Sequence, residues 1–227
     1  MSSNALPISS AAEVKPQGFA WFGKLPSAGD FISRRMPYAV QQFWDRWCAG
    51  GMEVMKERNQ MSGWGFWGNT PKWAFVLPAQ PGVPFGQLGV FAPSCDRVGR
   101  NFPFLVTTAV FGDSAIPVLQ RAAPIALAWS DVIAKAQISR AGMESVDAQL
   151  EFVLSTELAK EPPLADGDVT LPPGVSPTSL PWPGLAETFD LRGSESYWWS
   201  VPPADTGYRA RTHTGPLQAT QFCGLFL

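Results

Sequence analysis

Charged side chains gather in two short segments that are rich in glycine and proline. The first is GKLPSAGD, residues 23–30, with the arginine pair that follows it, and the second is PSCDRVGR, residues 93–100. Their polar and charged residues are Lys24, Asp30, Arg34, Arg35, Ser94, Asp96, Arg97 and Arg100. Because arginine can both fix a loop and bind a carboxylate or phosphate, the two segments are a candidate site for a protein partner or a phosphorylated ligand.

The turn-forming residues of the same segments are Gly23, Pro26, Gly29, Pro93 and Gly99. In one interpretation, Asp30 and Asp96 cap these turns and the arginines pair with them, so that the charges only fix the loops. In a second interpretation the fixed loops also bind a partner. In a third they form an enzyme site for a phosphorylated or nucleotide ligand. The residue types alone leave all three open.

The spacing of Gly18, Gly23 and Lys24 matches most of a phosphate-binding P-loop, G-x-x-x-x-G-K. However, Leu25 stands where a hydroxyl should bind magnesium, and Pro26 follows where a helix should run. Bulky aromatic residues also replace the flexible cradle that phosphates need. We therefore interpret this segment as a buried strand that ends in a turn.

Other catalytic patterns are weak. The single histidine, His213, lies in the polar segment RTHTGP, where a solvent-exposed histidine is expected rather than the base of a triad. Cys48, Cys95 and Cys223 form no C-x-x-C unit, and isolated thiols with carboxylates are an unusual ligand set for zinc. We expect no catalytic residue, metal or cofactor, although paired carboxylates leave no spacing pattern and keep an enzyme open.

Composition narrows the class of protein. The chain has 227 residues, 45% of them hydrophobic, which suits one full core and one domain. A net charge of -2 argues against a nucleic-acid partner, and three separated cysteines favour a reducing compartment. Residues 1–17 lack the apolar run of a signal peptide, and the apolar stretch at 122–129 is too short to span a membrane. We expect a cytoplasmic protein of unknown oligomeric state, with no membrane insertion, a disordered tail at 1–17 and a single domain at 18–227.

Apolar runs alternate with helical patterns along this domain. Strands are predicted at residues 19–22, 73–78, 87–93, 104–111, 197–201 and 221–227. Helices are predicted at residues 38–58, from 117 to 136 with a kink or break at Pro124, and at 144–160. The run at 104–111 shows no alternation with polar residues and should be a central strand covered on both faces. The pattern predicts an α/β fold, a three-layer α-β-α sandwich around a mixed central sheet, with an irregular loop at 161–184.

The chain has ten tryptophans. The periodic patterns place five of them in the core: Trp21, Trp44, Trp47, Trp73 and Trp129. The other five are compatible with an exposed recognition patch: Trp64, Trp67, Trp182, Trp198 and Trp199.

The two charged segments resemble a known family. WFGKLPSAGDFISRRMP, residues 21–37, followed by FWDRWC, resembles the N-terminal signature of TagF proteins. GVFAPSCDRVGRNFPFLV, residues 89–106, is similar to the family's strand, its Pro-Ser-x-Asp-x-x-Gly-Arg loop and its next strand. The signature region extends over residues 18–111. In the helical and C-terminal region, 112–227, SYWW is similar to a family element, whereas GPLQ replaces the usual Gly-Leu-Pro.

This resemblance implies a non-enzymatic accessory protein of a bacterial type VI secretion system. It implies repression of assembly or firing after translation, through binding of a cytoplasmic component, the forkhead-associated scaffold. Some members are fused to a Ser/Thr phosphatase domain, but this chain has no D-G-x-G motif of such a metal-dependent enzyme.

Both charged segments follow or precede apolar strands, so we expect them to meet at one end of the sheet. At least one ion pair should join them, with Asp30 and either Arg97 or Arg100 as the leading candidates. Arg34 and Arg35 are expected to face solvent and to be available to a partner.

Overall fold

The computed structural model describes residues 18–57, 70–160, 180–201 and 209–226. The predicted tail at 1–17, most of the irregular loop at 161–184, and Trp64 and Trp67 lie outside the described residues.

The strands form one seven-stranded sheet with the order β2-β1-β5-β4-β3-β6-β7. Their bounds are β1 Phe19–Gly23, β2 Ile32–Arg34, β3 Lys72–Leu77, β4 Gly86–Ala92, β5 Phe104–Val110, β6 Glu195–Val201 and β7 Ala210–Thr214. Every pairing between neighbours is antiparallel. The mixed sheet predicted from the sequence is therefore wrong. Loops too short for a helical crossover join β3 to β4 and β4 to β5, and such loops can only connect antiparallel neighbours.

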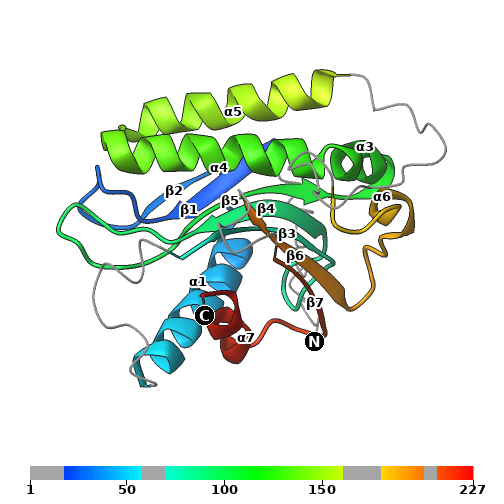
Figure 1. The fold of residues 1–227 in the computed structure, drawn as a ribbon, viewed down its shortest axis with the longest axis horizontal. Coiled ribbons are helices and arrows are strands. Elements are labelled where there is room, and N and C mark those ends of the chain that lie inside the picture. Colours follow the sequence, from blue (N-terminus) through cyan, green and yellow to red (C-terminus); the bar gives the residue numbers. More distant parts are fainter. Residues whose placement is uncertain (1–17, 58–69, 161–179, 202–208, 227) are drawn as a thin grey trace, which may run out of the picture.

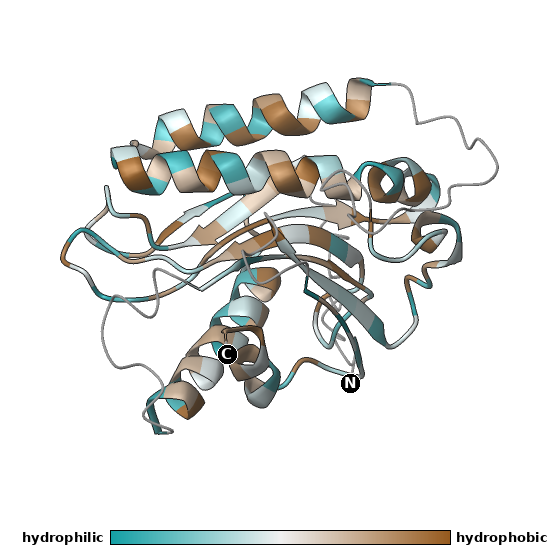
Figure 2. Cartoon of the chain, in the orientation of Figure 1, coloured by the Kyte–Doolittle hydropathy of each residue, from teal (hydrophilic) through white to brown (hydrophobic). Residues whose placement is uncertain are grey.

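Helices lie on both faces of this sheet, with α4 and α5 on one face and α1 and α7 on the other (Figure 1). The helices are α1 Tyr38–Glu57, α3 Ala115–Gln120, α4 Ala122–Ser139, α5 Met143–Ala159, α6 Leu185–Thr188 and α7 Ala219–Phe226, with a 3-10 turn at Gly112–Ser114. Hydrophobic and hydrophilic residues alternate along α4 and α5, as Figure 2 shows. This pattern lets each helix pack on one side and face solvent on the other.

The central strand β5 contributes to a core on each face of the sheet. Phe104 and Val106 belong to the cluster that includes α4, whereas Leu105 belongs to the cluster that includes α1. All seven residues of β5 are buried between β1 and β4. The prediction of a central strand is confirmed, and burial on both faces explains why its sequence shows no polar alternation.

Helix α1 packs on its face of the sheet through tryptophan. Trp44 is 0% and Trp47 is 5% exposed, which confirms the predicted burial of both. The Trp44 indole Nε1 donates a hydrogen bond of 2.9 Å to the side chain of Gln87, a buried residue of β4. An indole buried with its N–H satisfied anchors the helix to the strand.

The strand predicted at 221–227 is wrong, because Ala219–Phe226 forms helix α7. Phe222, Leu225 and Phe226 are spaced by three and one residues, which places them together on one helical face. That face packs on α1, where Gly51 leaves room for Phe222: a Cβ on Gly51 would lie 2.2 Å from the Phe222 ring.

The predicted helix from 117 to 136 is two helices that separate at Arg121. Pro124 falls in the first turn of α4, where the missing N–H costs no hydrogen bond.

The buried Trp198 and Trp199 belong to the core rather than to an exposed patch, and Trp182 packs partly buried against it. Among the described residues, no helix combines the length and apolarity that a membrane crossing requires.

Candidate functional site

The loop after β1 and the loop before β5 lie against each other, as predicted. The Ser94 hydroxyl donates to the Lys24 carbonyl at 2.7 Å, and the Arg97 N–H donates to the Ala28 carbonyl at 2.7 Å. The Arg100 guanidinium donates to the Gly29 carbonyl at 2.7 Å. We refer to residues 24–31 and 93–102 together as the composite loop site.

A buried ion pair holds the composite loop site together. Lys24 Nζ lies 3.0 Å from Asp96 Oδ2, and both side chains are buried. Asp96 also accepts hydrogen bonds from the backbone N–H groups of Val98 and Arg100, at 3.1 and 2.9 Å, and from Arg100 Nε at 2.6 Å. Because every charge here has a partner, these contacts offset the cost of desolvating the pair, and the pair fixes the loop geometry.

These contacts determine the ionisation of Asp96. Burial acts to raise the pKa of its carboxyl, but the hydrogen bonds from the Arg100 backbone, Lys24 and the Arg100 side chain outweigh burial. The net pKa lies well below the usual range, so Asp96 carries its negative charge at every physiological pH.

Glycine makes this close approach possible. Gly23 has φ +135°, and a Cβ at this position would lie 2.1 Å from the Pro103 carbonyl oxygen. Gly99 has φ +86°, and its N–H donates to the Asp96 carbonyl at 3.0 Å to close the second loop. A left-handed or extended-positive φ is accessible to glycine at little cost, which explains both residues.

Two prolines frame the same loops. Pro26 lies in the turn that the hydrogen bond from Ala28 N–H to the Leu25 carbonyl closes at 2.9 Å. The Pro93 carbonyl accepts a hydrogen bond of 2.7 Å from Gln137 of α4. The loops are thereby tied to the helical layer as well as to each other.

The predicted ion pair of Asp30 with Arg97 or Arg100 is wrong. The Asp30 carboxylate instead accepts a hydrogen bond of 2.8 Å from the N–H of Phe31, at an exposed position. The ion pair that joins the two loops is instead formed by Lys24 and Asp96. Lys24 directly follows β1, and its side chain enters the interior beside Asp96.

Arg34 and Arg35 both reach solvent, as expected, but each also forms an ion pair within the chain. Strand β2 pairs with β1 and brings the two side chains to the start of α5. Arg34 Nη2 lies 3.1 Å from Glu144 Oε1, and Arg35 forms a two-pronged ion pair with Asp147. The Arg35 guanidinium also lies 4.2 Å from the centre of the Phe19 ring, so this arginine joins the sheet to the helix.

Asp147 is the acceptor at this junction. It also receives a hydrogen bond of 2.6 Å from the indole Nε1 of Trp21. Burial acts to raise the pKa of Asp147, but the hydrogen bonds and charge of Arg35 together with the Trp21 bond leave it below its ordinary value. The junction is therefore ionic at neutral pH.

Two apolar side chains stand beside the exposed charges of the composite loop site. Phe31 is 45% exposed and Val98 is 70% exposed, and the side chains of Arg97 and Arg100 reach solvent beside them. Phe31 is held in place because its ring lies 4.7 Å from that of Phe102. Sequence reasoning missed Phe31 and Val98, although an apolar residue within a polar loop is the signal that could have identified them.

The geometry contradicts a P-loop, since β1 continues into a hairpin with β2 rather than into a helix, and Lys24 is engaged by Asp96. His213 lies on β7, the edge strand furthest from β1 and β2 in the sheet order. It is partly buried, with its Nε2 3.2 Å from the Pro216 carbonyl oxygen. Among the described residues, no group of three or more His, Cys, Asp or Glu is placed to hold a metal ion.

A family model described as the TagF N-terminal domain, type VI secretion system-associated, matches residues 20–154, which is more than half of the chain. The chain belongs to the TagF family. The match contains the whole composite loop site, all of helix α4 and most of helix α5. This TagF-family chain is thus associated with the type VI secretion system.

The TagF fold is similar to that of a solved structure, the protein PA0076 from Pseudomonas aeruginosa PAO1. The TM-score is 0.63 at 22% sequence identity, over 92% of this chain and 94% of that one. No curated protein sequence matches the chain significantly.

Proposed function

We propose that this TagF-family chain acts in the cytoplasm as a non-enzymatic repressor of a type VI secretion system. It acts after translation, by binding a protein component, and the forkhead-associated scaffold is the partner that the family resemblance suggests. The composite loop site provides the contact surface.

One observation supports this assignment above the others: Arg97, Phe31 and Val98 are each exposed on loops that a buried ion pair fixes. Arginine and aromatic side chains carry much of the energy of protein interfaces, and a rigid loop loses little entropy on binding. An enzyme acting on a phosphorylated or nucleotide ligand would need convergent groups that are free to react. Lys24 and Arg100 are instead both paired with the single carboxylate of Asp96.

The proposal is tested by titrating the full chain with the purified forkhead-associated scaffold of its own secretion system in a calorimeter. We expect Arg97→Glu to weaken binding by about tenfold or more, because one interfacial charge is worth about 1.4 kcal/mol or more when desolvated. Phe31→Ser should have a similar effect through the loss of an apolar anchor.

Arg192→Glu is the matched control, since Arg192 is exposed on a turn before β6 and outside the composite loop site. If Arg97→Glu and Phe31→Ser bind the scaffold as tightly as the unchanged chain, the composite loop site is not the contact surface.

A further inference from the structure

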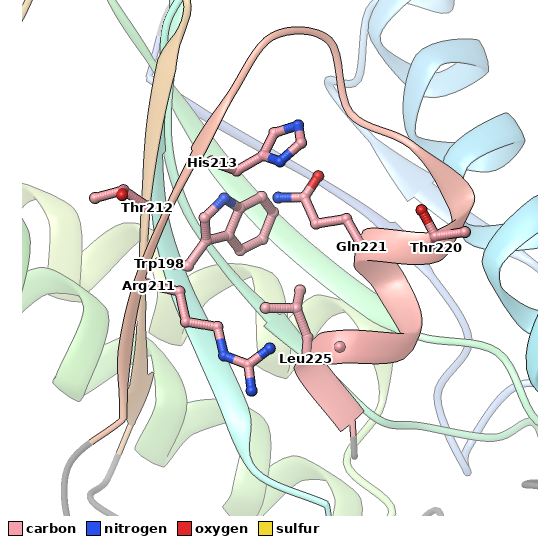
Figure 3. Close-up of a pocket in the computed structure, with 8 residues that line it drawn as sticks. Trp198, Arg211, Thr212, His213, Thr220, Gln221 and Leu225 are labelled. Atoms are coloured by element: carbon pink, nitrogen blue, oxygen red, sulfur yellow. The ribbon is translucent and has the colours of Figure 1, made fainter.

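A pocket adjoins β7, the edge strand of the sheet that lies away from the composite loop site. It has a volume of about 330 Å³ and lies between strand β7 and helix α7 (Figure 3). The side chains that line it include Trp198, Arg211, His213, Gln221 and Leu225. This lining contains a cation and several polar groups over an apolar floor, and no acidic residue.

The polar groups of this pocket are not all satisfied within the described part of the chain. Arg211 makes no ion pair with a described carboxylate, and its guanidinium lies 5.8 Å from the centre of the Trp73 ring. The side-chain Oε1 of Gln221 is buried without a hydrogen-bond partner among the described residues. A ligand that brings a negative charge and a hydrogen-bond donor would complement both groups.

Strand β7 is the last strand in the sheet order, so its outer edge has no neighbouring strand among the described residues. The Ser200 N–H donates to the Arg209 carbonyl, and the Gly215 N–H donates to the Ser194 carbonyl. The backbone groups of Arg209 and Gly215 therefore point toward β6. Backbone direction alternates along an antiparallel strand. The N–H and C=O groups of Thr212 and Thr214 therefore point outward, free to pair with an added strand.

The same alternation places side chains. Arg211 and His213 point toward α7 and the pocket, whereas Thr212 points away from it (Figure 3). An extended segment paired with the edge of β7 would carry alternate side chains on the pocket side.

We propose that β7 and its pocket bind an extended acidic segment of a protein partner. The segment adds a strand to the outer edge of β7 through the backbone of Thr212 and Thr214, and inserts a carboxylate toward Arg211. Main-chain hydrogen bonds provide affinity in this binding mode, and the pocket provides specificity. This site is separate from the composite loop site, and its failure would leave the proposed function standing.

The test uses the full chain and fluorescein-labelled peptides that alternate threonine and valine around one central glutamate, followed by fluorescence anisotropy. A peptide with glutamine in place of the glutamate is the matched probe. We expect the glutamate peptide to bind about tenfold or more tightly than the glutamine peptide. Arg211→Gln should remove that difference, whereas Arg192→Gln should preserve it.

Two further variants separate backbone pairing from charge recognition. Thr212→Pro removes one outward N–H at an edge position where proline is tolerated, so it should weaken both peptides equally. Gln221→Glu places a carboxylate beside Arg211 and should weaken the glutamate peptide selectively. It also keeps the test informative if Thr212→Pro does not fold, as circular dichroism would show.

Three outcomes overturn the proposal: neither peptide binds, the two peptides bind equally, or free glutarate competes as effectively as the unlabelled glutamate peptide. The last outcome would assign the pocket to small carboxylic acids instead of a protein segment.

Discussion

Asp96 joins both loops of the composite site through four hydrogen bonds to groups from either side. Asp96→Asn keeps the shape of the side chain but leaves the buried Lys24 ammonium without a counter-charge, which is strongly unfavourable. We expect a lower free energy of unfolding, measured by urea denaturation with an unchanged m-value. Asp30→Asn is the control, because Asp30 is exposed and bonds only locally to Phe31. Equal stability of the two variants would contradict this role for Asp96.

The junction of Arg35 with Asp147 should make stability depend on pH. The pKa of Asp147 is lowered in the folded chain, so its contribution is present above the unfolded value of about 3.9 and is lost as pH falls through the folded pKa. Arg35→Met should therefore lower the thermal midpoint at about pH 6 and change it much less at about pH 2. Arg34→Met should have a small effect at either pH, because its partner Glu144 is 82% exposed at the side chain. A loss in Arg35→Met that does not vary with pH would show that packing on Phe19, rather than charge, dominates.

The charged residues of the site could be predicted from the sequence, but their pairing could not. Residue type and turn chemistry identified both loops. The cation that pairs with Asp96 depends on the backbone conformation directly after β1, which directs the Lys24 side chain into the interior. Likewise, Arg35 points to α5 only because β2 pairs with β1 in one register, with Trp21 opposite Arg34. Such three-dimensional choices leave no pattern along the sequence.

Elements with long, regular apolar patterns were predictable, and short or polar elements were not. Helices α1 and α5 agree with their periodic patterns, and the core strands β3, β4, β5 and β6 agree with their apolar runs. Strand β2 has three residues, and β7 is a largely exposed strand of polar residues, so neither has an alternating apolar face. The short apolar run at 221–227 fits either a strand or a helix, and the packing of α7 on α1 decides in favour of the helix.

Helix α1 depends on Trp44 for its place on the sheet. Trp44→Ala should lower the free energy of unfolding by about 3–5 kcal/mol, because it removes a fully buried indole and leaves a cavity beside Phe75. Tyr38→Ala, on the same helix but 75% exposed, is the matched control. Chemical denaturation measures both, and a Trp44→Ala effect no larger than that of the control would contradict the packing described above.

At the scale of the whole molecule, the two proposed surfaces lie toward opposite edges of one rigid sheet. The composite loop site adjoins β1, next to the β2 edge, and the pocket adjoins β7. Substitutions that are distant and share no partner act additively. We expect Arg97→Glu to leave acidic-peptide binding unchanged and Arg211→Gln to leave scaffold binding unchanged, as titrations of each variant with each ligand will show. Loss of both activities in either variant would indicate coupling or misfolding.

The order of the strands also bears on how the chain folds. Neighbours β3, β4 and β5 pair across short loops, whereas Trp21 of β1 pairs with Val106 of β5, and Phe75 of β3 with Trp198 of β6. Closing long loops is slow, so the β3-β4-β5 meander should form early and β1 should join later. Pulse-labelling hydrogen exchange should accordingly protect the amides of β4 before those of β1. Because Lys24 reaches Asp96 only once β1 has paired with β5, a partly folded chain does not present the assembled loops, and only the finished molecule displays the proposed contact surface.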